Sequence, residues 1–281
     1  MNLFKAKRRT QNQKQIKPFE PLKIMKCNIC EGDAQKVFVG KILNKYEIEY
    51  FFCNNCEHLQ TQQAFWLEEA YNDAITASDT GIMQRNLMFR ELVSNVIYKL
   101  FDKDAKFVDF AGGYGIFTRL MRDVGFDFYR SDKYAPNLAA RGFDYNEGEK
   151  VELLCAFEAI EHFLNPLAEF EKMFEISDNV LISQTFLPYP VPLPEEWWYY
   201  GLEHGQHINF YSRKTLEFIA EKFNKKFCSY QDLHLFTSKK ITAKAFKKAV
   251  KKNSFEKIKS DMHSRTLDDM NFIISQKINK I

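Results

Sequence analysis

The spacing of hydrophobic residues changes along the chain and divides it into segments. Over residues 81–101 apolar side chains recur every three or four positions, which is the spacing of one helix face. The residues that follow this spacing are Met83, Leu87, Met88, Leu92, Val96, Ile97 and Leu100. Residues 66–71 carry a shorter helical signal. We therefore expect a helical connector over residues 66–103.

Strand and helix signals alternate from residue 104 onward. The expected strands span 106–110, 126–130, 151–157, 179–185, 227–230 and 234–237, and the expected helices span 116–124, 136–140, 166–176 and 212–223. Such alternation predicts right-handed crossovers and a mostly parallel sheet with helices on both faces. The expected fold class is therefore α/β, with a Rossmann-like domain over 104–240 and basic amphipathic helices over 241–281.

Polar and basic residues dominate the start of the chain, and their lack of periodicity predicts a disordered leader over residues 1–24. Gln and Asn follow the basic start where a secretory signal needs an apolar stretch. Every apolar run is far shorter than the roughly 20 residues of a membrane span. We expect a cytoplasmic protein without such a span. The net charge is only +3, and the basic runs are more typical of solvated tails than of phosphate-binding sites.

Two Cys-x-x-Cys pairs lie at 27–30 and 53–56, separated by enough residues for a hairpin. Four thiolates satisfy tetrahedral zinc at about 2.3 Å and leave no open position, as in structural zinc sites. Disulfides are disfavoured in a chain without a secretion signal, and a redox pair leaves the second pair unexplained. We expect a small zinc ribbon over residues 25–65 with the ligands Cys27, Cys30, Cys53 and Cys56. His58 is interpreted as a bystander, and Cys155 and Cys228 as core residues.

A glycine-rich turn follows the first expected strand of the large domain. Glycines there allow a sharp turn and the close approach of a ligand to the backbone. Asp109 begins the turn, and Asp132 ends the next strand, roughly 20 residues on, where ribose hydroxyls need an acceptor. A nicotinamide dehydrogenase normally has Gly-x-Gly-x-x-Gly, but the chain continues after Gly113 and Gly115 with Ile-Phe-Thr. The dehydrogenase alternative is therefore disfavoured.

At these residues the sequence resembles the class I S-adenosylmethionine (SAM)-dependent methyltransferases, whose first motif runs acid-x-Gly-x-Gly-x-Gly. Ala111 replaces the first glycine of that motif, and an extra Gly112 stands beside it. The resemblance covers roughly 106–237 and continues at 155–163, which is similar to the fourth motif followed by a Glu-His pair. It implies SAM as cofactor, with the binding residues Asp109, Ala111, Gly113, Gly115, Asp132, Phe157 and Glu158.

The resemblance also implies a role for some of these residues. Asp109 places the methionine moiety and Asp132 binds the ribose, while Phe157 and Glu158 border the region where the cofactor meets the acceptor. The alternatives for the acids are a helix cap at Asp132 and an exposed loop acid at Glu158.

Aromatic and histidine residues gather over 195–212, after the strand that ends near Thr185. Ligands of such folds bind at the carboxyl ends of parallel strands, so this segment is expected to form an acceptor pocket. An oxygen acceptor also needs a base that titrates near neutrality. The candidate catalytic residues are His207, His204 and Glu203, with His162 behind them. A core hydrogen bond is an equal alternative for His207, and the aromatics at 197–200 suit either stacking or a packed lid.

Chains with a ribbon and such a domain resemble two groups. One methylates sugars, sugar nucleotides and similar metabolites in bacterial surface-polysaccharide or antibiotic pathways, and the stretch at 205–212 is typical of it. The chain lacks the long extra domain of the sugar C-methyltransferases, which favours an oxygen acceptor over nitrogen or carbon.

The second group is the ribosomal RNA methyltransferases. Basic residues in the leader and tail suit it, but the ribbon shows no clear stripe of basic and aromatic residues. The ribbon also carries the acids Glu31, Asp33, Glu47, Glu49 and Glu57. A silent SAM-binding module is the third alternative, and the intact glycine turn argues against it. We expect a small-molecule acceptor and no nucleic-acid partner, and the sequence carries no signal for an oligomeric state.

Overall fold

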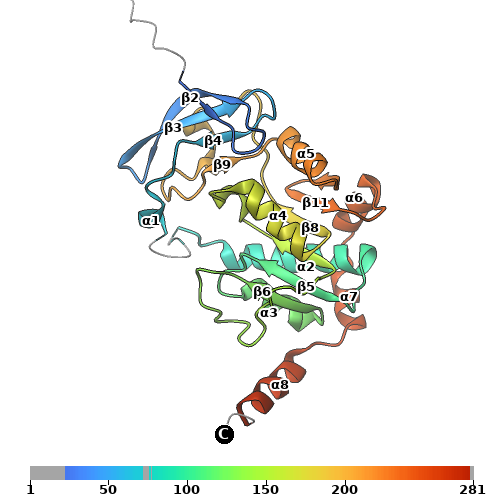
Figure 1. The fold of residues 1–281 in the computed structure, drawn as a ribbon. Coiled ribbons are helices and arrows are strands. Elements are labelled where there is room, and N and C mark those ends of the chain that lie inside the picture. The colour runs from blue at the N-terminus through green and yellow to red at the C-terminus, as the bar shows by residue number, and fades with distance from the viewer. Residues whose placement is uncertain (1–22, 72–75, 77, 279–281) are drawn as a thin grey trace, which may run out of the picture.

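A computed structural model describes residues 23–71, 76 and 78–278. Nearly all of the predicted leader, residues 1–22, lies outside the described residues. The described chain contains two β-sheets with helices around them, and Figure 1 shows the smaller sheet at the end of the molecule opposite to the last helix, α8 (Thr266–Ile278). The larger sheet lies between them.

The larger sheet has six strands in the order β10-β11-β8-β7-β5-β6. In chain order its strands are β5 (Lys106–Phe110), β6 (Asp127–Ser131), β7 (Leu153–Ala156), β8 (Asn179–Ser183), β10 (Lys226–Tyr230) and β11 (Leu233–Thr237). β5 pairs in parallel with β6 and β7, and β7 pairs in parallel with β8. β11 lies antiparallel between β8 and β10. The predicted α/β fold with a mostly parallel sheet is confirmed.

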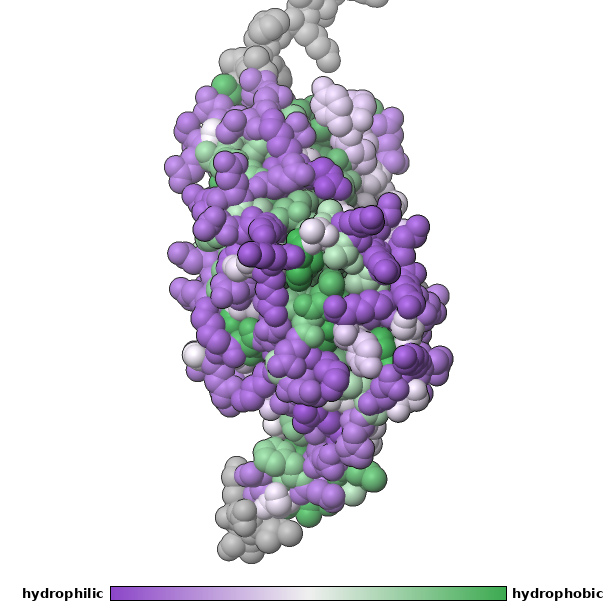
Figure 2. Space-filling view, turned by 90° about the vertical axis from the view of Figure 1, so that its right-hand side faces the viewer, coloured by the Kyte–Doolittle hydropathy of each residue, from purple (hydrophilic) through white to green (hydrophobic). Residues whose placement is uncertain are grey.

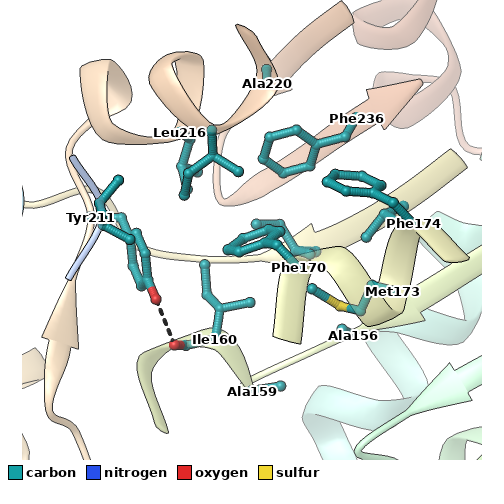
Figure 3. Packing of buried hydrophobic residues seen from close by; sticks show 14 of the residues in the cluster. Ala156, Ala159, Ile160, Phe170, Met173, Phe174, Tyr211, Leu216, Ala220 and Phe236 are labelled. Atoms are coloured by element: carbon teal, nitrogen blue, oxygen red, sulfur yellow. Dashed lines mark hydrogen bonds between the residues drawn. The ribbon is translucent and has the colours of Figure 1, made fainter. Parts of the chain in front are cut away.

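Alternate residues of each strand point to opposite faces of this sheet, and both faces are covered by helices. Leu154 and Ile182 face one apolar core, which includes side chains of α4 (Pro166–Ile176) and α5 (Arg213–Lys222). Figure 3 shows Phe170 and Met173 of α4 meeting Leu216 of α5 in this core. The neighbouring strand residues, Leu153 and Leu181 among them, face a second core on the other side. That core is completed by α2 (Ile82–Leu100), α3 (Ile116–Val124), α6 (Ala243–Lys251) and α7 (Phe255–Asp261).

Side-chain hydrogen bonds cap the starts of α5 and α6. α5 begins after Ser212, whose Oγ accepts a hydrogen bond from the Thr215 amide at 3.1 Å, because the first amides of a helix lack partners within it. The predicted helix at 136–140 is wrong. The Asn137 side chain accepts from the Ala140 amide and donates to its carbonyl oxygen, at 3.0 and 2.8 Å, and such local bonds compete with helical ones.

The smaller sheet joins the amino-terminal part of the chain to the large domain. Its strands run in the order β1-β2-β3-β4-β9, and every pair is antiparallel. They are β1 (Ile24–Lys26), β2 (Asp33–Ile42), β3 (Tyr46–Cys53), β4 (Leu59–Thr61) and β9 (Asn209–Phe210), and the short helix α1 (Leu67–Ala70) follows β4. β9 comes from the segment 195–212, which is rich in aromatic residues and histidines. Phe210 of this strand pairs with Leu59, and Asn209 pairs with Gln60.

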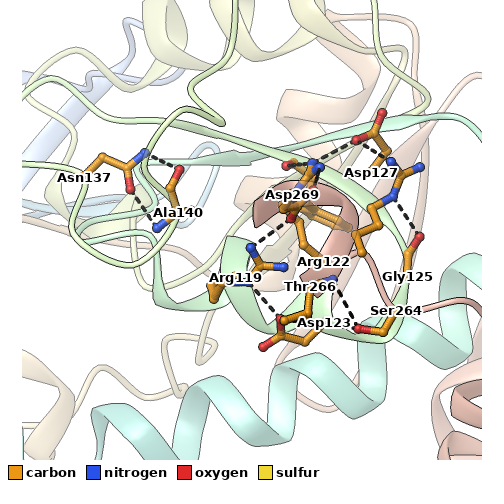
Figure 4. Close-up of polar contacts among 12 residues, drawn as sticks. Arg119, Arg122, Asp123, Gly125, Asp127, Asn137, Ala140, Ser264, Thr266 and Asp269 are labelled. Atoms are coloured by element: carbon orange, nitrogen blue, oxygen red, sulfur yellow. Dashed lines mark hydrogen bonds and ion pairs between the residues drawn. The ribbon is translucent and has the colours of Figure 1, made fainter. Parts of the chain in front are cut away.

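The last helix is attached to α3 by an ion-pair network. Arg122 donates from Nε and Nη2 to the two carboxylate oxygens of Asp269, at 2.8 and 2.6 Å, and from Nη1 to Asp127 at 2.8 Å (Figure 4). Hydrophilic side chains cover most of the face shown in Figure 2, with a hydrophobic patch near its middle. None of the helices within the described residues has the length and apolar character needed to cross a membrane.

Candidate active site

A cavity of about 370 Å³ opens at the carboxyl ends of β5 and β7, within the size range of small-molecule sites. The turn after β5 lines it with Asp109, Ala111, Gly112, Gly113 and Tyr114, and the end of β7 adds Phe157 and Glu158. The same cavity is also lined by His162, Glu203, His204 and His207. The structure therefore brings most of the sequence-predicted cofactor residues and all of the candidate bases to one cavity.

The turn after β5 has the tight backbone that its glycines predict. Gly113 and Gly115 have φ of 53° and 81°, and Ala111 adopts φ 55° without the freedom of a glycine. At Gly112 an added Cβ would lie 2.5 Å from Asp109 Oδ2, so a side chain there would clash with the acid. Around Gly113 nothing lies within 4 Å of an added Cβ, which leaves room for a ligand beside the backbone.

Asp109 is the buried acid at the base of this turn. It is 3% exposed, and its Oδ2 accepts a hydrogen bond from Thr118 Oγ1 of α3 at 2.8 Å. Burial raises the pKa of Asp109 to about 7, against the effect of the Thr118 bonds. A carboxyl group at this point of the cavity suits a cationic ligand group, which would favour its ionised form.

Asp132 and Gly115 lie next to the cavity but are not among the residues that line it. Oδ2 of Asp132 accepts from the Gly113 amide at 2.9 Å, and Oδ1 accepts from the amides of Tyr134 and Ala135, each at 2.8 Å. Asp132 thus joins the end of β6 to the glycine turn. Its expected ribose contact stays a prediction.

We call the lining residues His162, His204 and His207 the histidine wall of the cavity. The backbone near two 3-10 helices, η1 (Ile160–His162) and η3 (Trp198–Tyr200), positions these rings. His207 Nδ1 lies 2.7 Å from the Tyr199 carbonyl oxygen, and His162 Nδ1 lies 3.0 Å from the carbonyl oxygen of Gln206. Because a carbonyl only accepts, both rings donate from Nδ1. Burial lowers the pKa of His162 and, more strongly, that of His207, so both rings are neutral at pH 7.

His204 differs from these two rings. Its Nδ1 accepts a hydrogen bond from the Gln206 amide at 3.1 Å, so the proton of the neutral ring is on Nε2. Burial lowers the pKa of His204 as well. Glu203 is exposed at the rim of the cavity. Of the candidate bases, His207 therefore offers a free nitrogen lone pair from a fixed ring, and His204 offers a donor.

Most of the aromatic segment packs against the smaller sheet. One core contains Trp197, Tyr199 and Tyr200 together with residues of β2, β3 and β4. The 3-10 helix η2 (Pro194–Glu196) immediately precedes Trp197. Trp198 is 77% exposed and lines the cavity.

Several lining residues escaped the sequence reasoning. Arg85 at the start of α2 forms two hydrogen bonds to Asp79, at 3.1 and 2.7 Å, and its Nε lies 4.0 Å from Glu158 Oε2. No motif marks this pair. Glu161 was also missed as a site residue, although it precedes His162 in the Glu-His pair and follows Glu158 by three positions, which was an available signal.

The four cysteines of the two Cys-x-x-Cys pairs form one cluster at the smaller sheet. Their sulfur atoms all lie within 4.8 Å of one another, and no described cysteine is in a disulfide. Cys27, Cys53 and Cys56 are buried beside residues of the large domain such as Tyr211 and Leu216. Four thiols at this separation suit a structural zinc ion, which supplies a cross-link when bound. His58 is not part of this group; its Nε2 lies 3.1 Å from Asn209 Oδ1.

Residues 83–227 match the model of a protein family described as a methyltransferase domain, while no curated protein matches the chain. Among solved structures, the chain is similar to an O-methyltransferase family protein from Burkholderia thailandensis, with 14% identity, 62% of this chain and 68% of that chain covered, and a TM-score of 0.42.

Two further similarities involve proteins solved with a form of the cofactor. Human N-acetylserotonin methyltransferase in complex with SAM is 13% identical, with 61% and 65% covered and a TM-score of 0.40. Magnesium protoporphyrin IX methyltransferase from Synechocystis with bound S-adenosylhomocysteine is 11% identical, with 62% and 94% covered and a TM-score of 0.38.

Proposed function

The chain belongs to the methyltransferase-domain family and carries a SAM-dependent methyltransferase domain, and from this premise we propose that it methylates an oxygen of a small polar acceptor. The acceptor class that we propose is a sugar or sugar nucleotide of a bacterial surface-polysaccharide pathway, modified in the cytoplasm. One observation supports the proposal above others: the same cavity is lined by Asp109 with the glycine turn and by three histidines.

The cofactor side of this proposal uses the turn after β5. Asp109 and the backbone of Ala111 and Gly113 would hold the methionine part of SAM, and Asp132 would bind the ribose after exchanging part of its contact with the glycine turn. Phe157 stacks on Phe89 at a centroid distance of 4.3 Å and would border the cofactor where it meets the acceptor. Bound SAM supplies a methyl group on a positively charged sulfur.

The acceptor side needs alignment, exclusion of water and removal of a proton. The methyl–sulfur bond breaks as the oxygen–methyl bond forms, and the acceptor hydroxyl loses its proton. His207 is the residue that we expect to assist the loss of this proton, because its ring is fixed by the Tyr199 carbonyl, has a free nitrogen and lines the same cavity. Trp198 and the rim acid Glu203 would contact the sugar, since exposed aromatic and acidic groups suit apolar and hydroxyl faces respectively.

The four-cysteine cluster has a structural role in this proposal. A bound zinc ion would fix β2 and β3, and through the shared sheet it would fix β9, which immediately follows the His207 segment. The ribbon then supports the acceptor site through β9 without itself lining the cavity.

Two measurements test the proposal in sequence. Calorimetry with SAM should give a clear isotherm, and a screen of sugars and sugar nucleotides with methyl-labelled SAM should give a labelled product whose methyl group is assigned to an oxygen by nuclear magnetic resonance. SAM binding without transfer to any sugar, together with RNA binding that falls steeply with salt, would favour an RNA acceptor instead. The absence of SAM binding would overturn the enzymatic proposal.

A further inference from the structure

Three side chains that could hold a metal ion meet beside the cavity; His162 and His207 line it, and Glu161 is fully buried. Ligand atoms of Glu161, His162 and His207 all lie within 4.8 Å of one another. Glu161 and His162 are neighbours on η1, and His207 reaches them because the next amide, that of Ile208, donates to the Glu161 carbonyl oxygen at 2.9 Å. Asn209 fixes the same join by donating to the Phe163 carbonyl oxygen at 2.6 Å. These hydrogen bonds therefore hold the three potential metal ligands together.

Both histidines of this cluster have the arrangement of metal ligands. Each uses Nδ1–H to donate to a backbone carbonyl, at Gln206 and Tyr199, which leaves Nε2 with a free lone pair. Metal-bound histidines commonly have such a partner on the second nitrogen, because it fixes the tautomer and the orientation of the ring. His204 lacks the arrangement, since its Nδ1 accepts a hydrogen bond.

Glu161 adds a buried oxygen without a partner. The residue is fully buried, and its Oε1 accepts from the Tyr199 hydroxyl at 2.8 Å, but its Oε2 forms no hydrogen bond. A buried polar atom without a partner is costly, so natural proteins seldom leave one without a function. A cation bound at this oxygen would provide the missing interaction and would offset the negative charge of the ionised carboxylate.

We propose that Glu161, His162 and His207 hold a divalent transition-metal ion that binds the methyl acceptor. Two imidazoles and one carboxylate on one side of an ion leave its other positions open to oxygen ligands from the cavity. This ligand set suits manganese, iron, cobalt or zinc better than magnesium, which prefers oxygen ligands throughout. The ion is separate from the one expected at the four cysteines, whose thiolates leave no open position.

The proposed ion narrows the acceptor class, a step that rests on the proposed function. An ion with neighbouring open positions binds two hydroxyl oxygens of a vicinal diol, as found in sugars. The ion lowers the pKa of the bound hydroxyl; the hydroxyl proton passes to water, and the resulting oxygen anion takes the methyl group while the sulfur keeps the electrons of the broken bond. His207 then acts on the acceptor as a ligand of the ion and does not itself receive the proton.

Manganese binding tests the site directly and without turnover. The full-length chain, with zinc at its cysteines confirmed by metal analysis, is titrated with Mn²⁺ alone, and the electron paramagnetic resonance signal of free aqueous Mn²⁺ is followed. We expect one Mn²⁺ per chain. We further expect that Glu161→Gln, His162→Ala and His207→Ala each weaken binding more than about tenfold. Retained SAM affinity, measured on each variant, shows that it is folded.

His204→Ala is the matched control, because His204 lines the same cavity without belonging to the cluster. We expect this variant to bind Mn²⁺ like the wild-type chain. Unchanged free Mn²⁺ signal with the wild-type chain overturns the inference. So does binding that survives in all three ligand variants, or that is lost equally in the control.

Turnover separates this inference from the proposed function. Enzyme treated with a chelator that leaves the zinc in place should lose methyl transfer to a vicinal diol and regain it on addition of Mn²⁺. Full methyl transfer by the metal-free enzyme refutes the proposed metal site but agrees with the proposed sugar methyltransferase activity. Mn²⁺ binding with no transfer to any sugar keeps the site and refutes the proposed acceptor.

Discussion

Among the residues that the structure describes, two clusters could hold a metal ion, and they are built in opposite ways. The four cysteines come from two short motifs, are mostly buried and surround a common centre with four equal sulfur donors. Glu161, His162 and His207 come from segments about 45 residues apart and offer mixed ligand atoms; the two histidines line the cavity, whereas Glu161 is fully buried. A closed set of donors suits structure, whereas an open set leaves positions for a substrate.

Removal of zinc should have the largest effect, because a structural zinc site contributes on the order of 10 kcal/mol to folding. We expect the double variant Cys27→Ser, Cys56→Ser to lose zinc, the fold of the smaller sheet and methyl transfer together. Metal analysis and circular dichroism measure the first two. Cys228→Ala, which changes a core cysteine outside the cluster, should keep its zinc. A wild-type chain that is folded without zinc would refute the structural ion.

Loss of the His207 ring tests the cluster of Glu161, His162 and His207. His207→Ala should lower turnover by about 10²- to 10⁴-fold, the range for a group that assists proton removal, while SAM affinity stays unchanged. Steady-state kinetics and calorimetry measure the two quantities. His263→Ala, at an exposed position, is the control. Normal turnover in His207→Ala would leave His207 with only its core hydrogen bond.

A histidine with both nitrogens occupied provides the contrast to the cavity rings. His234 Nδ1 lies 2.9 Å from Ser229 Oγ, and its Nε2 lies 2.8 Å from the Gln184 carbonyl oxygen. Burial lowers the pKa of His234 to about 4. The folded chain therefore binds fewer protons than the unfolded chain between about pH 4 and 6.5. Its contribution to stability is complete above pH 6.5 and is lost as the pH falls toward 4.

Denaturant unfolding at pH 7 and pH 4 measures this contribution. The wild-type chain should lose on the order of 3 kcal/mol more than His234→Gln over this interval. Comparison with the variant is needed because burial raises the pKa of Asp109 and Glu161 to about 7, which acts in the opposite direction. Equal losses in the two chains would show that the pKa of His234 is the same in the folded and the unfolded chain.

The smallest effect is expected at Asp132, on the cofactor side. Asp132→Ala should weaken SAM binding by about 10- to 100-fold, because it removes the expected ribose acceptor and the support of the glycine turn. Calorimetry measures the affinity. Asp144→Ala is the control, since Asp144 bonds to Arg130 but not to the glycine turn. Unchanged SAM affinity would exclude Asp132 from the cofactor site.

The sequence predicts best where the determining contacts are local. The Cys-x-x-Cys pairs, the glycine turn and the ends of α3 and α4 follow from neighbouring residues, and their positions agree with the structure. The failed helix at 136–140 also has a local cause, the side chain of Asn137, but its hydrogen bonds do not show in the apolar pattern.

Contacts between distant segments could not be predicted. β9 has only two residues and carries no periodic signal, and its partner β4 lies about 150 residues earlier. Trp197 and Tyr200 are buried against the smaller sheet by contacts with segments that are also distant in the sequence, so their burial could not be predicted either. The sequence shows Glu161 as part of a Glu-His pair. Its proposed role as a metal ligand also depends on His207, which the fold brings beside it.

The two residues of β9 decide how this protein can be taken apart. Deletion of everything before α2 would remove β4 and leave the amide and carbonyl groups of Asn209 and Phe210 exposed, two positions beyond His207. A shortened chain designed to isolate the catalytic domain would therefore lose the shape of its substrate pocket along with the ribbon. For crystallography or engineering, the residues before α2 have to be kept as a part of the catalyst and not treated as a detachable tag.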